Sequence, residues 1–319
     1  MAATQVLYGH SVAHLSVSMP DAIGDILGFF KGVPIFFILS GYLIWMSVGR
    51  SKSYKEYLCK RFWRICPELW VAVLIELLVL SSLYEGPYNL IQTIAFVFGQ
   101  LTIFQFWTPA CLRDYGCGVP NGALWTISVL IQFYIIVWFI YKRLHNTNYK
   151  RWFIAILLTL AISFASEWLS DYVPTVVDKL YRNCVIPYLW MFVIAAFFAE
   201  YKDRLLPILT KYWIVFLALA IIVYVTRIEI GGYRYGVLST ITLTLSTLAI
   251  AYAVPQINVK TDISYGLYIY HMTVVNAMII LGMKEEPKYI FVTIVVSAIL
   301  AYCSTKSIGA ISKKMKNKI

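Results

Sequence analysis

Apolar residues in this chain gather into runs that recur along its whole length, with short polar links between them. A run of about 20 apolar residues makes a helix long enough to cross the hydrocarbon core of a bilayer. The pattern therefore predicts an all-α protein, a polytopic transmembrane helical bundle. The candidate spans cover approximately residues 1–18, 32–49, 68–84, 89–107, 122–141, 152–168, 184–200, 212–226, 236–254, 263–281 and 289–309.

The composition agrees with a membrane protein. Of the 319 residues, 60% are hydrophobic and 13% are charged, and the mean hydropathy is +0.72, whereas soluble domains carry about 25% charged residues. The net charge of +11 comes from basic residues in the links between the runs. Basic residues in that position anchor cytoplasmic loops, so we expect membrane lipids as partners and no nucleic acid. No linker or internal repeat interrupts the pattern, which favours a single transmembrane domain over residues 1–319.

Loop charge indicates how many of the runs cross the membrane, because Lys and Arg collect on the cytoplasmic side. A full span at 89–107 places the basic link at 142–151 outside, whereas ten spans place it, and most of the 27 Lys and Arg residues, inside. We therefore predict about ten spans with both termini cytoplasmic, in the inner (plasma) membrane of a bacterium. The segment 89–107 is then re-entrant or packed sideways, and its glutamines suit burial against protein.

Two histidines lie in the first run, in the sequence VLYGHSVAHLSVS. His10 and His14 are four residues apart and share one face of a helix. Ionisable residues within a membrane span are functional candidates, and the alternative is a hydrogen-bonded structural role. A histidine pair at this spacing can also bind metal, but no third ligand lies nearby in the sequence, so we expect no metal site.

A cationic segment follows the second run. Arg61 and Arg64 are three residues apart and share a helix face, with Lys60 adjacent to it. Guanidinium groups form paired hydrogen bonds with phosphate, so this segment is a candidate anion site. The alternative is that the same residues anchor the helix to lipid headgroups.

Other polar residues interrupt apolar runs or flank them. Glu76 is the lone acid of its run, and His271 is surrounded by tyrosines in ISYGLYIYHM. Cys111 and Cys117 flank a short polar loop and would form a disulfide if that loop faced an oxidising compartment. The other cysteines are expected to be packing residues.

Small and hydroxylated residues interrupt the second run at Ser40, Gly41 and Tyr42. Such residues allow two membrane helices to approach closely. They can also line a passage through the bundle, and the sequence leaves both roles open.

Five segments occur together in the order that is typical of one family of membrane proteins. They are VLYGHS with His10, GVPIFFILSGYLI, KRFWRICP with Arg61 and Arg64, NGALWTISVLIQFYI, and ISYGLYIYHM with His271. The chain thereby resembles the acyltransferase 3 family over residues 6–272. Each segment alone is degenerate, but the set in this order is specific.

Two positions depart from the family pattern. The family usually has Arg or Lys eleven positions before the first-helix histidine, which here would precede Met1, so we expect upstream codons to supply it. Many members have glutamate where this chain has Leu130, although Gln132 is close by. Glu76 is the candidate replacement for that acid.

The resemblance implies an enzyme that transfers an acyl group, usually acetyl, from acyl-CoA to a hydroxyl of a cell-surface or lipid-linked glycan. Acyl-CoA (acetyl-CoA) is then the donor substrate, and no permanently bound cofactor is expected. By the same resemblance, His10 acts as a general base or as a covalent acyl carrier. Arg61, Arg64 and Lys60 would bind the phosphates of coenzyme A. Further candidates for acceptor binding or acyl passage are His14, Ser40, Trp125, Tyr268 and His271.

A glycan or lipid transporter without acyl-transfer chemistry is the alternative function. Such a protein would also be a helical bundle dotted with polar residues. It should have discontinuous helices and internal repeats, and the sequence contains no repeat.

Overall fold

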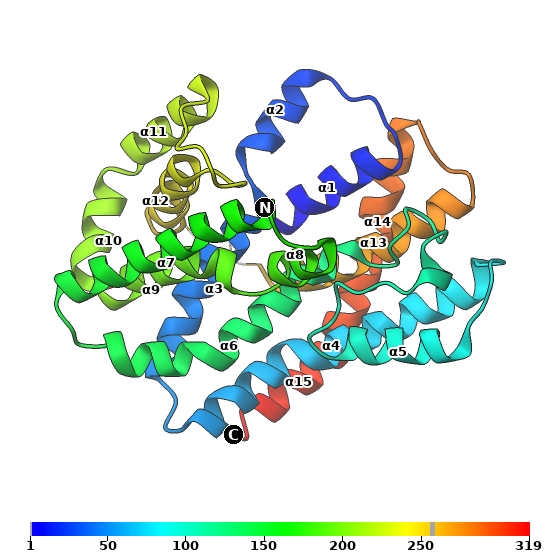
Figure 1. The fold of residues 1–319 in the computed structure, drawn as a ribbon, viewed down its shortest axis with the longest axis horizontal. Coiled ribbons are helices and arrows are strands. Elements are labelled where there is room, and N and C mark those ends of the chain that lie inside the picture. The colour runs from blue at the N-terminus through cyan, green and yellow to red at the C-terminus, as the bar shows by residue number, and fades with distance from the viewer. Residues whose placement is uncertain (1, 256–258) are drawn as a thin grey trace. The chain divides into compact units, whose positions relative to one another are not determined.

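The structure is a computed structural model that describes residues 2–255 and 259–319. Within these ranges every regular element is a helix and no β-strand occurs, which confirms the all-α prediction (Figure 1). The chain forms two compact units that alternate along the sequence. Unit 1 comprises Met1–Gly28, Leu58–Ser128 and Val259–Ile319, and unit 2 comprises Phe29–Tyr57 and Val129–Asn258, as far as these segments are described.

Unit 1 contains the two ends of the described chain and one central segment. The elements that lie wholly or mainly in it are α1 (Ala2–His14), α2 (Asp21–Phe29), α4 (Tyr54–Leu83), α5 (Leu90–Leu101), the short helices η1 (Ala110–Leu112) and η2 (Gly122–Leu124), α13 (Ser264–Ile280), α14 (Pro287–Ser304), η4 (Thr305–Gly309) and α15 (Ala310–Lys316).

Unit 2 contains the helix of the second apolar run and the middle of the chain. Its elements are α3 (Gly32–Gly49), most of α6 (Trp125–Leu144), α7 (Tyr149–Ser170), α8 (Thr175–Arg182), η3 (Ile186–Tyr188), α9 (Leu189–Glu200), α10 (Lys202–Lys211), α11 (Trp213–Thr226) and α12 (Val237–Ala253).

The helices α1, α13 and α14 pack against one another in unit 1. Their apolar side chains form a cluster in which Leu15, Val275 and Ile290 are buried. Gly266 lets α13 and α14 come close, because a Cβ atom there would lie 2.6 Å from the side chain of Ala301. This packing brings the first helix of the chain against a helix more than 250 residues later.

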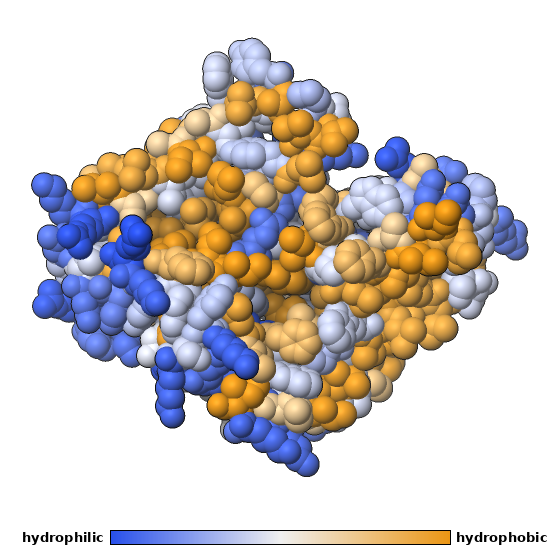
Figure 2. All heavy atoms as spheres, turned by 60° about the horizontal axis from the view of Figure 1, so that its bottom comes forward, coloured by the Kyte–Doolittle hydropathy of each residue, from blue (hydrophilic) through white to orange (hydrophobic). Residues whose placement is uncertain are grey.

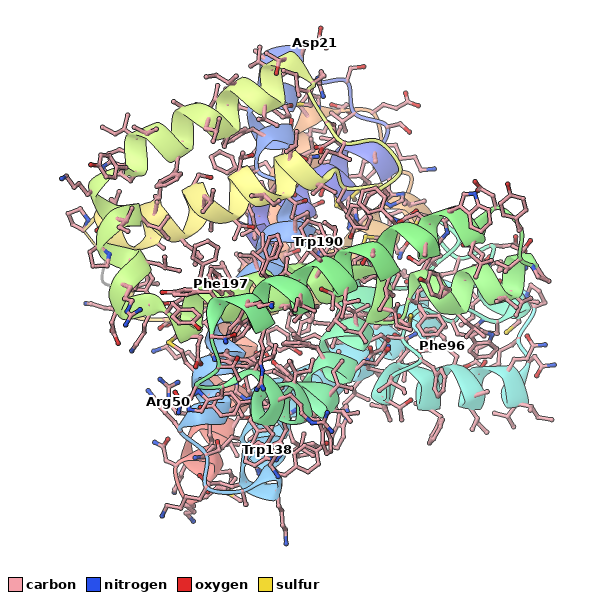
Figure 3. The ribbon with its side chains drawn as sticks, turned by 60° about the vertical axis from the view of Figure 1, so that its left-hand side comes forward. Asp21, Arg50, Phe96, Trp138, Trp190 and Phe197 are labelled. Atoms are coloured by element: carbon pink, nitrogen blue, oxygen red, sulfur yellow. The ribbon has the colours of Figure 1, made fainter. Side chains whose placement is uncertain are left out.

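Helix α9 forms the centre of unit 2, where it packs against α3 and α7. A Cβ atom at Gly41 would lie 2.7 Å from the carbonyl oxygen of Phe192, so this glycine permits close approach of α3 and α9. Trp190 is buried on α9, and Phe197 packs edge-on against the buried Trp152 of α7; Figure 3 labels Trp190 and Phe197. The close-approach role expected for the Ser40–Tyr42 segment is therefore present at Gly41.

Among the described residues, five helices are long and apolar enough to cross a membrane, or up to seven if each of two bent helix pairs counts as one span. The bends are 47° between Thr175–Arg182 and Ile186–Glu200, and 76° between Lys202–Lys211 and Trp213–Thr226. These helices make the chain a multi-pass integral membrane protein. The count of ten spans and the cytoplasmic side of both termini stay predictions.

The first and fourth apolar runs form short helices. Helix α1 has 13 residues and α5 has 12, which at 1.5 Å per residue gives lengths of about 20 and 18 Å. Both are shorter than the hydrocarbon core of about 30 Å. The re-entrant or sideways placement of 89–107 stays a prediction, and α1 is shorter than a straight membrane-spanning helix at the first run would be. In α5, the side chain of Gln100 is buried against protein and donates to the carbonyl oxygen of Gln105.

Many large apolar side chains are exposed on the outer faces of the helices, among them Leu74 and Leu78 of α4 and Leu158 of α7. Figure 2 shows orange, hydrophobic side chains over much of the visible face, with blue, hydrophilic ones in separate patches. Apolar faces of this extent suit contact with lipid.

All six cysteines lie within the described ranges, and all are free thiols. The disulfide considered for Cys111 and Cys117 is therefore not present. The thiol of Cys117 instead donates a weak hydrogen bond to the carbonyl oxygen of Val119, at 3.6 Å. The loop is held to α13 by other side chains, which are described below.

Candidate active site

The packing of α1 on α13 brings His10 and His271 into direct contact in unit 1. Nδ1 of His10 lies 2.9 Å from Nε2 of His271, and the two rings are nearly parallel, with centroids 5.1 Å apart. His271 is fully buried, whereas His10 is only partly buried. The histidine expected to be catalytic therefore has one ring nitrogen committed to a buried partner.

Hydrogen bonds to the backbone decide which nitrogens carry protons. Nδ1 of His271 lies 2.7 Å from the carbonyl oxygen of Tyr268 and 3.2 Å from that of Leu267. Carbonyl oxygens only accept, so this nitrogen is the donor. In a neutral imidazole the other nitrogen, Nε2, then accepts, so His10 donates to it from Nδ1. The remaining lone pair of His10 is on Nε2, which has no hydrogen-bond partner among the described residues.

His14 lies one turn further along α1, partly buried, with its ring centroid 5.8 Å from that of His10. No described residue forms a hydrogen bond with its ring nitrogens. His14 is therefore beside the His10–His271 pair but is not held by it.

Tyr268 connects α13 to the start of α6. Its buried hydroxyl donates to the carbonyl oxygen of Ala123 at 2.8 Å and shares a 2.6 Å hydrogen bond with the hydroxyl of Thr126. Trp125 is the first residue of α6 and is partly buried. These contacts fix the backbone next to the carbonyl group that orients His271.

Two asparagines that the sequence did not single out hold the 116–124 loop on α13. The side-chain nitrogen of Asn276 donates to the carbonyl oxygens of Val119 and Pro120, and that of Asn121 donates to the carbonyl oxygen of Ile269. Gly116, with φ +55°, leaves room for Asn276, since a Cβ atom would collide with its amide. The sequence signal for Asn276 was a lone carboxamide side chain within the apolar run 263–281.

Glu76 is 1% exposed on α4, and neither of its carboxylate oxygens has a hydrogen-bond partner among the described residues. It lies beside Asn121.

Leu130, at the position where the family often has glutamate, is 3% exposed on α6. Near it, Gln132 accepts from Val185 N and donates to the carbonyl oxygen of Asn183, so this amide fixes the link between α8 and η3.

The basic segment lies in the first part of α4, which continues through Pro67. Arg64 is exposed, while Arg61 and Lys60 are partly buried. Arg64 interacts with the carboxylates of Glu68, one turn later, and Asp262, in the loop before α13.

Burial raises the pKa of Asp262, but the hydrogen bond from Ser264 N and the positive charge of Arg64 outweigh it and hold this pKa below its ordinary value. Neither Arg61 nor Arg64 forms a hydrogen bond or ring contact with His10 or His271 among the described residues.

Ser40, the remaining candidate, is partly buried on α3 in unit 2.

Among the described residues, no group of three or more His, Cys, Asp or Glu side chains is arranged to hold a metal ion.

The sequence matches known proteins over most of its length. The acyltransferase 3 family model, described as "Acyltransferase domain", matches residues 1–305. Nodulation protein 10 from Rhizobium leguminosarum bv. viciae is 26% identical over 313 residues, covering 88% of this chain and 82% of that protein. An O-acetyl transferase from Shigella phage Sf6 is 28% identical over 293 residues, covering 88% of this chain and 83% of that protein.

A longer relative matches over part of its length. The peptidoglycan O-acetyltransferase OatA from Listeria monocytogenes is 22% identical over 287 residues, which are 78% of this chain and 45% of that protein. No solved structure matches the chain.

Proposed function

This chain belongs to the acyltransferase 3 family, and we propose that it transfers an acetyl or related acyl group from acyl-CoA to a hydroxyl of a cell-surface or lipid-linked glycan. It is an acyltransferase enzyme in a multi-pass membrane protein. The observation that carries the proposal is the hydrogen bond from Nδ1 of His10 to Nε2 of His271. It presents the other nitrogen of His10 as a lone pair in a fixed direction.

In the general-base route, His10 activates the acceptor directly. Its Nε2 takes the proton of the acceptor hydroxyl while the hydroxyl oxygen bonds to the acyl carbon. The carbon–sulfur bond of the thioester then breaks, and Nε2 returns the proton to the coenzyme A thiolate. His271 accepts from Nδ1 throughout and holds the ring, as the orienting partner of a base does in other acyl transferring sites.

In the covalent route, the same lone pair attacks the thioester. Nε2 bonds to the acyl carbon and coenzyme A leaves as its thiolate. The acceptor oxygen then takes the acyl group from Nε2, and the hydroxyl proton ends on the thiolate. A burst of free coenzyme A without acceptor distinguishes this route from the first.

The donor is assigned to the basic segment of α4. Arg61 and Arg64 are on one face of the helix, and Arg64 is exposed, so a phosphate can reach the guanidinium group. The carboxylates of Glu68 and Asp262 are close enough to interact with the positive charge of Arg64. Lys60 adds a third positive charge to the same segment.

Acceptor binding and the acyl passage are assigned to His14, Ser40, Trp125 and Tyr268, under a topology of ten spans in a bacterial inner membrane, whereas both ring nitrogens of the buried His271 are committed and hold His10. His14 is the strongest of these for contact with an acceptor, because it lies beside His10 without a hydrogen bond to a described residue. The hydroxyl of Tyr268 is committed to Ala123 and Thr126, which favours a structural contribution.

A transporter is the second candidate function, because two helix pairs are bent by 47° and 76°, and transporters have discontinuous membrane helices. One experiment separates the two. Purified His10→Ala and wild-type proteins are incubated with radiolabelled acetyl-CoA and a glycan acceptor, and labelled ester is counted. Transfer by wild type and not by the variant supports the enzyme; glycan movement into vesicles without any ester formation supports the transporter.

A further inference from the structure

Unit 2 contains a surface pocket that the proposed acyl-transfer chemistry does not use. Its volume is about 640 Å³, within the range of about 300–1,000 Å³ that is usual for ligand sites. Its walls come from the last turns of α7, the end of α8 and the loop before α12. The lining includes Phe164, Glu167, Trp168, Asp171, Arg182 and Gly232.

Aromatic rings form one side of this pocket. The side chain of Trp168 is 65% exposed, and its ring lies 5.0 Å from that of Tyr172 on the next turn. Gly232 has φ +87°, and a Cβ atom there would lie 3.3 Å from the ring of Phe164. The loop reaches that ring because this residue is glycine.

The polar groups of the pocket are held in place by their neighbours. Nε of Arg234 donates to Oε1 of Glu167 at 2.6 Å. Nε of Arg182 contacts both carboxylate oxygens of Asp178 at 2.6 Å. Fixed side chains lose little entropy when a ligand binds.

Two carboxylates of the pocket have oxygens that accept no hydrogen bond from a described residue. Oε2 of Glu167 receives no hydrogen bond from a described residue. The exposed carboxylate of Asp171 makes no hydrogen bond or ion pair within the described part of the chain. The pocket therefore has unused acceptors beside an open indole face.

This combination is complementary to a sugar. The C–H face of a pyranose ring packs on an indole, its hydroxyls donate to carboxylates, and its ring and hydroxyl oxygens accept from a guanidinium group. We propose that the pocket binds a saccharide unit of the acceptor glycan, separate from the unit whose hydroxyl reacts. This inference rests on the proposed function. In the ten-span topology the last turn of α7 and the loop 227–236 face outward, where a cell-surface glycan is.

The competing role for Trp168 and Tyr172 is that of aromatic anchors at the membrane–water interface. An anchor needs the aromatic rings but not the carboxylate of Asp171, whereas a sugar site needs both. A substitution of Trp168 and a substitution of Asp171 therefore separate the two roles.

The test measures binding without catalysis. The probe is the cell-surface polysaccharide of the producing bacterium, stripped of ester groups with mild alkali, and binding to detergent-solubilised His10→Ala protein is followed by microscale thermophoresis. In this background we expect Trp168→Ala and Asp171→Asn each to raise the Kd on the order of tenfold. Trp168→Phe keeps an aromatic face and should recover part of the affinity.

A matched control is Trp70→Ala, which removes an exposed tryptophan of α4 that does not line the pocket. It should leave the Kd unchanged. The inference is overturned if the polysaccharide does not bind, if Asp171→Asn binds as tightly as the parent protein, or if Trp70→Ala loses as much affinity as Trp168→Ala.

Acyl transfer by the wild-type protein to the same polysaccharide is measured separately. Binding that depends on Trp168 and Asp171, without any transfer, rejects the proposed function and leaves the sugar site standing. Transfer with unchanged affinity in both pocket variants rejects the sugar site alone.

Discussion

His10 and His271 are 261 residues apart in the sequence, and a 2.9 Å hydrogen bond joins their rings. The backbone carbonyl oxygens of Leu267 and Tyr268 fix the proton of His271 on Nδ1. This leaves Nε2 of His271 to accept from His10 and leaves Nε2 of His10 as the reactive atom.

Replacement of His10 by alanine should lower acyl transfer by about 10²–10⁴-fold, because the variant lacks the base or acyl carrier. His14→Ala is the matched variant, since it removes an imidazole one turn away on the same helix, and it should keep measurable activity. Transfer from radiolabelled acetyl-CoA by both purified proteins is the measurement. Robust activity in His10→Ala would show that His10 is not the base or acyl carrier. Loss of activity only in His14→Ala would assign that role to His14.

His271 is a positioning residue in this scheme. His271→Ala should lower kcat by about 10- to 100-fold, because a hydrogen bond to a group that becomes charged contributes about 1.5–3 kcal/mol. The KM for acyl-CoA should stay the same. His271→Gln keeps an acceptor atom and should recover part of kcat. Equal activity of the Ala and Gln variants would show that the hydrogen bond has no part in the reaction.

Arg61→Lys and Arg64→Lys should each raise the KM for acyl-CoA, because lysine has the charge but not the planar pair of donors that matches a phosphate. Arg50→Lys is the control, since Arg50 follows the end of α3 outside this segment. Steady-state kinetics on correctly inserted protein are the measurement. Full transfer by both variants would mean that the two arginines only anchor α4 to lipid headgroups.

Glu229 should stabilise the start of α12. Its carboxylate accepts from the backbone nitrogens of Leu238 at 2.6 Å and Ser239 at 3.0 Å. Burial raises the pKa of Glu229, but these hydrogen bonds outweigh it and hold the pKa below its ordinary value. Glu229→Gln should therefore lower the free energy of unfolding by about 0.5–2 kcal/mol at neutral pH, as loss of a helix cap does.

The loss of stability in Glu229→Gln should depend on pH, because the pKa of Glu229 is lowered in the folded protein. A carboxylate with a lowered pKa contributes fully above its unfolded pKa of about 4.3, and the contribution disappears as the pH falls through the folded pKa. The Tm difference between wild type and Glu229→Gln should thus be constant from about pH 5.5 to 8 and shrink in more acidic detergent buffer. Glu285→Gln is the control, because its carboxylate has no bond to a described residue. A Tm difference that grows as the pH falls would contradict the role of the Glu229 carboxylate in stabilising the start of α12.

The ten-span topology is tested by cysteine labelling on a cysteine-free background. Labels at His145 and Asp203 should be protected from an impermeant maleimide in intact cells, and labels at Asp114 and Gly231 should react. All four positions are exposed in the structure, whereas Tyr115 is fully buried and would be a poor reporter. Reaction at His145 from outside would make 89–107 a full span.

The positions of the helices were readable from the sequence, because the free energy of moving apolar residues out of water is a local property of each run. The run at 32–49 became α3 (Gly32–Gly49), and Arg61 and Arg64 lie three residues apart within the helix α4. The sequence also marked His10 and His271 as unusual, since a polar group in an apolar run needs a reason.

The partner of each polar group was decided by the tertiary structure. No periodicity in the sequence connects His10 with His271, Tyr268 with Thr126, or Asn276 with the 116–124 loop. The first pair forms because α1 packs on α13, and the other two form because the segment 116–126 packs on α13. The hydropathy pattern placed the boundary near residue 212, but the 76° angle between Lys202–Lys211 and Trp213–Thr226 is visible only in the tertiary structure. Local hydrophobicity specified the helices, and side-chain fit between distant segments selected which of them meet.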